Sequence, residues 1–462
     1  MPRHDPLELR ARELCLAASQ EPDTRIPKPG EPEGGRTMPA WTSFRQQARD
    51  EQTATNTAQM ALDAANIDAT RSAHGVVTTQ DSGTAAVPLT VLGKHEQGTL
   101  DQMRACMGVG HVAAGVICAD GHIGYAQPVG GVIGYVDQIS VSGVGFDIAC
   151  GNMAVRLDVP FSAVEDRVDT ILADIRRVIS FGVGRTNDER VSDPLFDNKA
   201  QWQACGMEDY RQKSQAQLGT VGGGNHYVDL LRDENDMVWV GVHFGSRGTG
   251  HTIATRHLKL AGGRDGMFVP PTVLRVQSEL GQSYLSGMDL AGRYAYAGRR
   301  WVVERVRQII GGKVEDTVHN HHNFAFQETH SGQEMWVVRK GATPAFPGQR
   351  GFIGGSMGDD AVIVQGLDTP EAKAALHSTI HGAGRMFGRR EAKRQFTREQ
   401  MDAWLHERGV RVSGGDVDES PMAYRRLPEV LAHHEGSVKV LHTLRPFAVA
   451  MAGPAEYDPW KD

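Results

Sequence analysis

The chain is organised around ten residues, Gly143-Val144-Gly145-Phe146-Asp147-Ile148-Ala149-Cys150-Gly151-Asn152. Asp147 and Cys150 are three positions apart, so a turn or a helix start places both side chains on one side. The glycines around them let the backbone bend where a Cβ atom would resist. A carboxylate and a thiolate on a tight loop suit a divalent metal ion. A lone free cysteine is more often a small buried hydrophobe, so the remaining ligands must come from elsewhere in the chain.

Length and composition set broad limits. The 462 residues fit one large domain or two fused domains, and the net charge of -7 does not indicate a nucleic-acid-binding protein. A local basic patch is still compatible with that total. The five cysteines are scattered without a CxxC pair, which argues against a disulfide framework and favours a reducing compartment. No apolar run approaches the roughly 18 residues of a membrane span, and no signal-peptide core is present. The sequence therefore predicts a cytoplasmic protein without a membrane partner.

The organisation along the chain changes near Val87. Residues 1–40 are rich in proline and glycine and are expected to be peripheral, with a short helix near 7–18. Residues 41–75 carry helix formers, and from Val87 onward short apolar runs alternate with glycine turns. The residues that could carry chemistry span positions 120–385 without a sharp boundary, which favours one interwoven domain.

Hydrophobic periodicity predicts the regular elements. Helices are expected at 98–107, 162–180, 276–310 and 397–408, and residues 368–395 are expected to be largely helical. Strands are expected at 113–118, 129–136, 153–159, 238–243 and 438–451, with a glycine loop leading into a strand over 218–230 and with strands and turns over 335–365.

The candidate metal ligands share a local context, because each stands at a strand end or beside glycines: Asp147, Cys150, His226, His243 and His322. One carboxylate, one thiolate and three imidazoles exceed a single three-ligand catalytic site. They fill two adjacent sites if the cysteine sulfur bridges two ions. Imidazole and carboxylate suit manganese, iron or zinc. Because these positions are far apart in sequence, polar core histidines remain an open alternative.

A second group of motifs is suited to anions. The run Gly222-Gly223-Gly224-Asn225 offers backbone N–H groups as phosphate loops do, although a tight turn explains it equally well. Arg247, Lys340 and Arg385 place cations beside glycines, where phosphate binding and a solvated surface charge are equal alternatives. His381 precedes Gly-Ala-Gly-Arg and is expected to be exposed on a flexible loop. A neutral imidazole can attack phosphorus and form a phosphoramidate.

Taken together, several motifs in this order resemble the RtcB family of RNA-splicing ligases from about Gln102 to Gly453. The matching segments are Asp120–Gly124, Gly143–Gly151, Gly219–His226, His243–His251, His322-Asn323, Arg339–Thr343, Gly355–Gly358 and His381–Arg385. Each motif alone is a weak signal, whereas their combination is specific to the family.

The resemblance implies an α+β fold in which one large RtcB-type domain has central β-sheets surrounded by helices. That catalytic domain is expected over 41–453, between an N-terminal extension (1–40) and a C-terminal tail (454–462). The implied activity joins RNA ends bearing a 2′,3′-cyclic phosphate or 3′-phosphate to a 5′-hydroxyl, in tRNA splicing or RNA repair. The implied cofactors are GTP and two Mn²⁺ ions per chain. An archease-like activator is an implied candidate partner.

The resemblance also assigns roles to residues. It implies that Asp147, Cys150, His226, His243 and His322 bind the metals, with Cys150 bridging, and that His381 accepts GMP from GTP. The family's His-Asn pair aligns best with His322-Asn323, and His319-Asn320 is the rival alignment. The implied nucleotide contacts are Asn225, Asp229, His322, Asn323, Gly354, Gly355, Ser356, Met357, Gly382, Ala383 and Gly384.

The sequence departs from the family pattern around the nucleotide. Gly354 replaces a proline, Ala361 a serine and Met451 a lysine, and Asp229 is shorter than the usual glutamate. The metal ligands and His381 are intact. Two alternatives to the ligase therefore remain: a two-metal phosphodiesterase or cyclic phosphodiesterase that does not ligate, and a non-catalytic relative that binds RNA ends.

Overall fold

The computed structural model describes residues 6–23, 25–27, 37–44, 47–48, 51, 74–77 and 87–456. The chain divides into two compact units, Met1–Arg71 and Ser72–Asp462. The first unit contains α1 (Pro6–Ala17) and the paired strands β1 (Arg25–Pro27) and β2 (Thr37–Pro39). None of the helices in the described part of the chain is both long enough and apolar enough to cross a membrane.

The second unit is built on an eight-stranded sheet, which carries the candidate ligands. Its order is β12-β8-β10-β9-β20-β17-β16, and β19 joins β20 in parallel. The strands are β8 (Gly151–Pro160), β9 (Tyr227–Arg232), β10 (Met237–His243), β12 (Val314–His321), β16 (Arg350–Ile353), β17 (Ala361–Gly366), β19 (Arg411–Ser413) and β20 (Val438–Met451). All the neighbouring pairs along the main path whose register is given are antiparallel.

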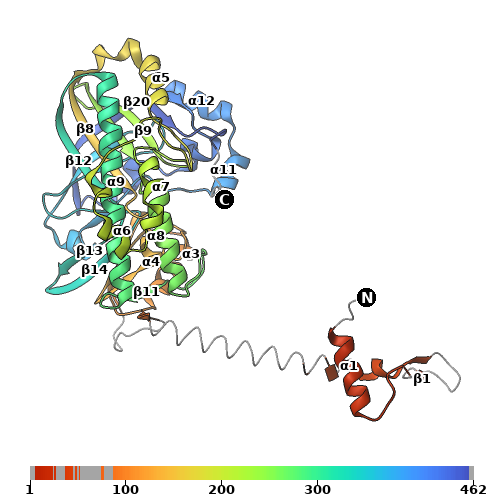
Figure 1. The fold of residues 1–462 in the computed structure, drawn as a ribbon. Coiled ribbons are helices and arrows are strands. Elements are labelled where there is room, and N and C mark those ends of the chain that lie inside the picture. The colour runs from red at the N-terminus through yellow and green to blue at the C-terminus, as the bar shows by residue number, and fades with distance from the viewer. Residues whose placement is uncertain are drawn as a thin grey trace. The chain divides into compact units, whose positions relative to one another are not determined.

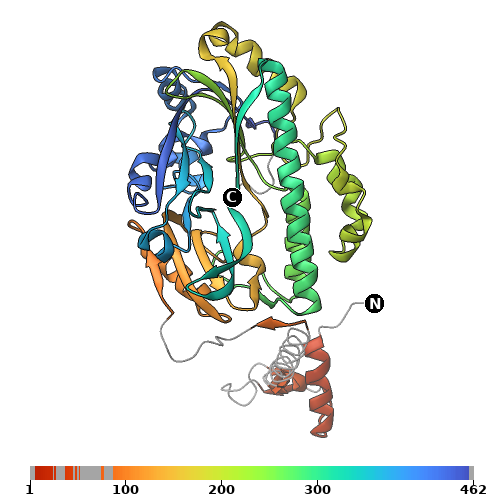
Figure 2. The same cartoon turned by 90° about the vertical axis from the view of Figure 1, so that its left-hand side faces the viewer.

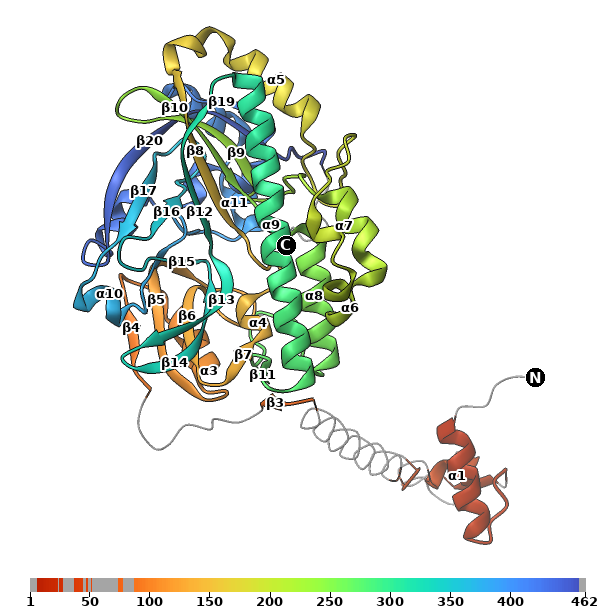
Figure 3. The ribbon, with the colours of Figure 1, turned by 60° about the vertical axis from the view of Figure 1, so that its left-hand side comes forward.

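A five-stranded sheet forms the other half of this unit, with the order β13-β14-β6-β5-β4 (Figure 3). Its strands are β4 (Leu89–Val91), β5 (Val112–His122), β6 (Val129–Tyr135), β13 (Asn323–His330) and β14 (Gln333–Lys340). Two small sheets complete the strands: β3 (Val76–Val77), β11 (Val273–Arg275) and β7 (Gln138–Ser140), and β15 (Ala342–Pro344) with β18 (Ser378–Ile380).

One helix, α9 (Glu279–Ile310), runs along both halves of the second unit (Figures 1 and 2). It packs against β8 and β10 of the eight-stranded sheet and against α8 (Arg247–Leu260). The other helices are α3 (Gln97–Met107), α4 (Val141–Val144), α5 (Val168–Val178), α6 (Lys199–Ala204), α7 (Arg211–Gln217), α8 (Arg247–Leu260), α10 (Pro370–Ala374), α11 (Arg389–Gln395), α12 (Arg398–Glu407) and α13 (Leu427–Ala432).

The apolar core explains why α5 and α9 lie on the eight-stranded sheet. The apolar face of α5, including Ile171 and Ile175, packs with Val302 and Val306 of α9 and with inward side chains of the sheet such as Val240. Each fully buried aliphatic side chain contributes about 1.5–3 kcal/mol relative to exposure. The sheet is therefore fixed as a rigid base for the loops at its edge.

Most of the predicted elements are confirmed, including the long helix over 276–310 and the strand over 438–451. The mixed α+β class is confirmed as well. The prediction of a largely helical 368–395 is wrong, because only α10 and α11 form there. Between them, β18 pairs with β15, and Gly384 adopts a φ of +77° that a helix does not allow.

Two predictions are not tested by the described residues. The helix formers of 41–75 lie mainly in 52–73, beyond the described residues. The domain limits at 40 and 453 stay predictions.

Candidate metal centre and nucleotide pocket

Strand pairing brings the candidate ligands to one edge of the eight-stranded sheet. Cys150 immediately precedes β8 and His226 immediately precedes β9, whereas His243 ends β10 and His322 follows β12. Because β8 runs antiparallel to β10 and β12, its first residues meet their last ones: Asn152 pairs with His243, and Gly151 pairs with His321. The spacing in sequence is large, but the register makes the four side chains neighbours.

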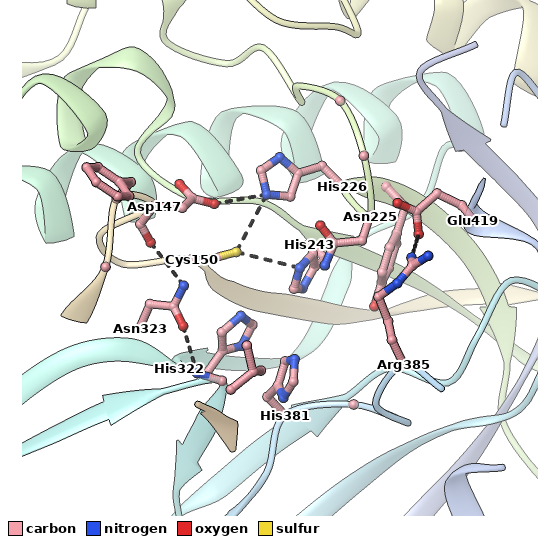
Figure 4. Close-up of a pocket in the computed structure, with 18 of the residues that line it drawn as sticks. Asp147, Cys150, Asn225, His226, His243, His322, Asn323, His381, Arg385 and Glu419 are labelled. Atoms are coloured by element: carbon pink, nitrogen blue, oxygen red, sulfur yellow. Dashed lines mark hydrogen bonds and ion pairs between the residues drawn. The ribbon is translucent and has the colours of Figure 1, made fainter. Parts of the chain in front are cut away.

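The ligand atoms lie within contact distance of one another (Figure 4). The Cys150 sulfur is 3.6 Å from Nε2 of His226 and 3.6 Å from Nε2 of His243. Nε2 of His226 is 3.0 Å from Oδ2 of Asp147. The three donor atoms of Cys150, His226 and His243 all lie within 4.8 Å of one another, and all three residues are buried.

These donors fit a bound metal ion. Two ligands at about 2.1 Å (nitrogen) and about 2.3 Å (sulfur) from a tetrahedral ion are about 3.6 Å apart, which is the separation of the sulfur from both imidazoles. The ring of His322 stacks on that of His243 with centroids 5.0 Å apart. Its buried Nδ1 has no hydrogen-bond partner among the described residues. A buried polar atom without a partner costs free energy, which a metal ligand bond removes.

The surroundings keep the imidazoles in the ligating form. Burial, reinforced by the neighbouring His226, lowers the pKa of His243 well below its ordinary value, so the ring is neutral. Nδ1 of His243 is 2.6 Å from Oδ1 of Asn152, so Nδ1–H donates a hydrogen bond to the amide oxygen and Nε2 faces the cluster with its lone pair. Burial and Asp147 raise the pKa of the Cys150 thiol, a trend that a bound cation opposes.

The loop that carries Cys150 is held in a strained conformation. Ala149 has a φ of +60°, which residues with a Cβ rarely adopt. Its N–H donates to the Asn323 carbonyl at 2.7 Å, and its carbonyl accepts from the fully buried Arg299 at 3.0 Å. Gly151 must be glycine, since a Cβ there would lie 2.2 Å from the carbonyl oxygen of Asn320. The tight approach of β8 and β12 therefore presents Cys150 to the cluster.

Arg299 binds His319, the alternative to His322 as a metal-ligand candidate. Its Nη2 lies 2.9 Å from Nε2 of His319 and 2.9 Å from Nδ1 of His321, away from the cluster. His322 instead lies between His243 and His381, and its ring centroid is 5.0 Å from that of His381. The structure thus brings His322 to the cluster, and it places His319 against Arg299 and Tyr296.

A single cavity of about 910 Å³ contains the whole predicted site. It is lined by every candidate residue: Asp147, Cys150, Asn225, His226, Asp229, His243, His322, Asn323, Gly354, Gly355, Ser356, Met357, His381, Gly382, Ala383 and Gly384. Of the positions where the sequence departs from the family pattern, Asp229, Gly354 and Met451 line this cavity, whereas Ala361 of β17 is buried in a hydrophobic core.

His381 is held more firmly than the sequence predicts. Only 15% of its side chain is exposed, so the prediction of an exposed, flexible loop is wrong. The residue follows β18 directly, and the buried carboxylate of Asp120 fixes it. Oδ2 of Asp120 accepts from Nδ1 of His381 at 2.6 Å and from its backbone N–H at 3.0 Å. Burial would raise the pKa of Asp120, but His381 lowers it below its ordinary value.

The far side of the cavity is a network of ion pairs that the sequence did not indicate. The buried carboxylate of Glu419 accepts from Arg385 at 3.1 Å and also pairs with Arg389 and Tyr424. Arg389 donates to Oδ2 of the fully buried Asp418 at 3.0 Å. The carboxylates here are neutralised by guanidinium groups of this chain.

Two adjacent arginines extend this network. Arg425 donates to the carbonyls of Asp120 at 3.1 Å and Gly121 at 3.3 Å. Arg426 donates to both oxygens of Asp359, at 2.7 and 2.8 Å, and Asp359 accepts from the hydroxyl of Ser356 at 2.5 Å. No local spacing signals these contacts, since the arginines reach positions far back in the chain.

Fold and site together define the class: a mixed α+β enzyme with a buried Cys/His/His candidate metal centre beside a histidine–aspartate pair. Residues 102–452 match the family model described as "tRNA-splicing ligase RtcB". The chain is 33% identical over 371 residues to the RNA-splicing ligase RtcB of Escherichia coli K12, covering 72% of this chain and 88% of the relative. It is 31% identical over 419 residues to the RNA-splicing ligase RtcB of Mycobacterium tuberculosis, covering 73% and 96%. It is 31% identical over 417 residues to the tRNA-splicing ligase RtcB of Nanoarchaeum equitans, covering 72% and 87%. The chain belongs to the RtcB family of RNA ligases.

Proposed function

We propose that this protein is a GTP- and Mn²⁺-dependent RNA ligase that joins 2′,3′-cyclic phosphate or 3′-phosphate ends to 5′-hydroxyl ends in tRNA splicing or RNA repair. Family membership supports RNA ends as substrates. The observation that carries the proposal is the orientation of His381. Asp120 accepts a hydrogen bond from the Nδ1–H of His381, and no described residue bonds to Nε2, so Nε2 keeps a lone pair beside the ligand cluster.

The proposed first step uses that lone pair. Nε2 of His381 attacks the α-phosphorus of GTP, a P–N bond forms, and pyrophosphate leaves. Asp120 holds the imidazole in the required tautomer and stabilises the positive charge that develops on the ring, as the aspartate of a catalytic triad does. Asn225 and the backbone of Gly382 and Gly384 line the space for the triphosphate.

The next two steps transfer and release GMP. An oxygen of the RNA 3′-phosphate attacks the phosphorus on His381, which breaks the P–N bond and returns the electron pair to Nε2. The 5′-hydroxyl then attacks the RNA phosphorus, GMP leaves, and the hydroxyl proton is lost to the medium. A cyclic phosphate must first gain one water molecule to become a 3′-phosphate.

Asp147, Cys150, His226, His243 and His322 are the residues that we propose would hold two Mn²⁺ ions. When bound, such ions offset charge on phosphate oxygens. Replacing Cys150 with alanine removes the donor shared by both imidazole contacts, so the metal content of the purified protein should fall. An unchanged metal content would rule out Cys150 as a metal ligand.

Incubation with Mn²⁺ and GTP labelled in the α-phosphate tests the central step. We expect acid-labile label on the wild-type protein and none on His381→Ala, with metal content retained in the variant. Label that persists in His381→Ala would overturn the assignment of the nucleophile.

A phosphodiesterase that does not ligate is the second candidate, favoured by the nucleotide end of the cavity. Asp229 faces this cavity, and its carboxylate has no partner among the described residues, while the neighbouring Met451 supplies no cation. Opening of a cyclic phosphate by a protein that never takes up label would favour this candidate over the ligase.

A further inference from the structure

The cavity has two ends, separated by the ligand cluster. In Figure 4, Asp147 and Glu419 lie on opposite sides of the Cys150 sulfur. At the Glu419 end, Arg385 binds Glu419 and follows Gly382–Gly384, and Gly382 pairs with Gly354. Gly354 lies against Tyr227, which packs with Met357. We assign these glycine loops to the nucleotide. If the nucleotide occupies that end, the RNA that reacts at His381 must lie at the Asp147 end.

The Asp147 end is aromatic, and the proposed function does not use its rings. Tyr125, Phe146, Tyr210 and His251 all line the cavity. Phe146 adjoins Asp147 in sequence, and the Lys340 side chain, which approaches Gly145, donates to the Tyr125 carbonyl. The Tyr210 hydroxyl lies against Gly248, which follows Arg247. Phe146 and His251 form one continuous surface, with ring centroids 5.2 Å apart and planes tilted by 30°. Tyr125 is 38% exposed. One face of Phe146 and Tyr210 packs on the core, so the rings are positioned from behind.

Cations surround these rings, in contrast to the negative total charge of the chain. The ammonium group of Lys213 lies 5.1 Å from the centre of the Tyr210 ring. Arg247 and Lys340 line the same end, and Asp265 is the carboxylate that accompanies Asp147 there among the described lining residues. Flat apolar rings among cations are the combination that binds unpaired nucleotides, because bases stack on the rings while cations meet the phosphates.

We propose that Tyr125, Phe146 and His251 form a stacking subsite for the unpaired terminal base of the RNA, with Lys213 beside its phosphates. This inference rests on the proposed function, since it takes the nucleotide to occupy the other end. The subsite accepts any base, because stacking requires only the flat face of the ring. It selects ends that are single-stranded, since a paired base cannot leave its stack to enter the cavity.

The test combines protein variants that lack a ring with RNA ends that lack a base, and it compares the four resulting affinities. The variants are Tyr125→Ala and Phe146→Leu, and the control is Tyr296→Ala, a tyrosine of similar exposure (41%) that lies outside this cavity. The RNA oligonucleotides carry either a normal or an abasic terminal nucleotide, placed first on the 5′-hydroxyl strand and then on the 3′-phosphate strand. Affinity is measured by fluorescence anisotropy without GTP, and sealing is measured separately as a function of RNA concentration.

We expect the abasic end to weaken binding to the wild-type protein at least about fivefold on one of the two strands. Tyr125→Ala or Phe146→Leu should weaken binding of the normal end by the same factor. In these variants the abasic end should bind no more weakly than the normal end. The RNA concentration for half-maximal sealing should rise by a larger factor than any fall in guanylylation of His381. The Tyr296→Ala control should keep the full abasic penalty.

An abasic end that binds the wild-type protein as tightly as a normal end would overturn the subsite. So would an abasic penalty that is undiminished in both variants. Because binding is measured without GTP, it is independent of ligation. A protein that never guanylylates or seals but shows the abasic-sensitive binding would refute the proposed function and leave the subsite intact.

Discussion

The metal side and the nucleotide side of the cavity differ in how their polar groups are partnered. On the metal side, Cys150, His226 and His243 face one another, and the buried Nδ1 of His322 has no partner. On the nucleotide side, Glu419 and Asp359 are each bound by arginines of this chain. On the first side the buried donors fit a metal ion, whereas on the second the arginines neutralise Glu419 and Asp359, and Asp229 is the lining carboxylate without a partner among the described residues. The comparison indicates that metal removal should disturb the first side far more than the second.

Asp120 binds His381, which lies between the metal side and the nucleotide side. Among the substitutions considered, replacing Asp120 should lower activity the most. Asp120→Asn keeps the shape but cannot hold the His381 tautomer, so guanylylation should slow by about 10²- to 10⁴-fold. Rapid-quench measurement with labelled GTP gives the rate. Metal content and the thermal unfolding midpoint, from the same preparations, are the controls. A rate within about fivefold of wild type would show that Asp120 does not orient the nucleophile.

Arg299 tests whether the metal side depends on its support. Arg299→Met removes the donor to Ala149, Phe244 and two histidines, and leaving these buried acceptors unpaired should lower the free energy of unfolding by about 3 kcal/mol. Urea unfolding measures this loss, and metal content should fall with it. The matched control is Arg300→Met, because Arg300 is 62% exposed and its pair with Asp193 contributes little. Equal losses in the two variants would contradict the special role of Arg299.

His434 contacts β5, the strand that carries Asp120, and should make the free energy of unfolding depend on pH. Its Nε2 accepts from the N–H of Ala119 at 3.2 Å, and burial lowers its pKa to about 4. The unfolded chain, with a pKa of 6.5, binds the proton more readily. The contribution of the neutral His434 ring to the free energy of unfolding is therefore complete above pH 6.5 and is lost as the pH falls towards 4. It amounts to about 2 kcal/mol between pH 7.5 and 5.

Urea unfolding at the two pH values, on wild type and His434→Gln, measures that contribution. Glutamine retains an acceptor but does not titrate, so the acid-induced loss should be smaller in the variant by about 2 kcal/mol. The same loss in both proteins would place the acid sensitivity elsewhere.

The pair between Arg426 and Asp359 should have the smallest effect, because 38% of the arginine side chain is exposed and solvent screens the pair. Arg426→Met frees Asp359 and the Ser356 turn, so the KM for GTP in guanylylation should rise about threefold while kcat changes less. The charge-swapped protein, Arg426→Asp with Asp359→Arg, should recover part of the loss. No recovery would mean that Arg426 acts through packing on Trp404 instead.

The sequence alone determined much of this protein. The motif order identified the family and the α+β class, hydrophobic periodicity located the long helix α9 and the strand β20, and all sixteen candidate residues line one cavity. The helix and the strand were predictable because hydrophobic periodicity depends on residues adjacent in sequence. The candidate residues could be named because each belongs to a short family motif, whereas their meeting in one cavity depends on the fold.

Only the tertiary structure decided how those residues are partnered. The register of β8 with β12 places His322 at the cluster and His319 against Arg299. The pairing of β18 with β15 replaces an expected helix and brings His381 onto Asp120, 261 positions away. Arg385, Arg389 and Arg426 likewise bind carboxylates that no local pattern relates to them. The physical reason is that hydrogen bonds and ion pairs depend on separation in space, whereas propensity and periodicity act only along the chain.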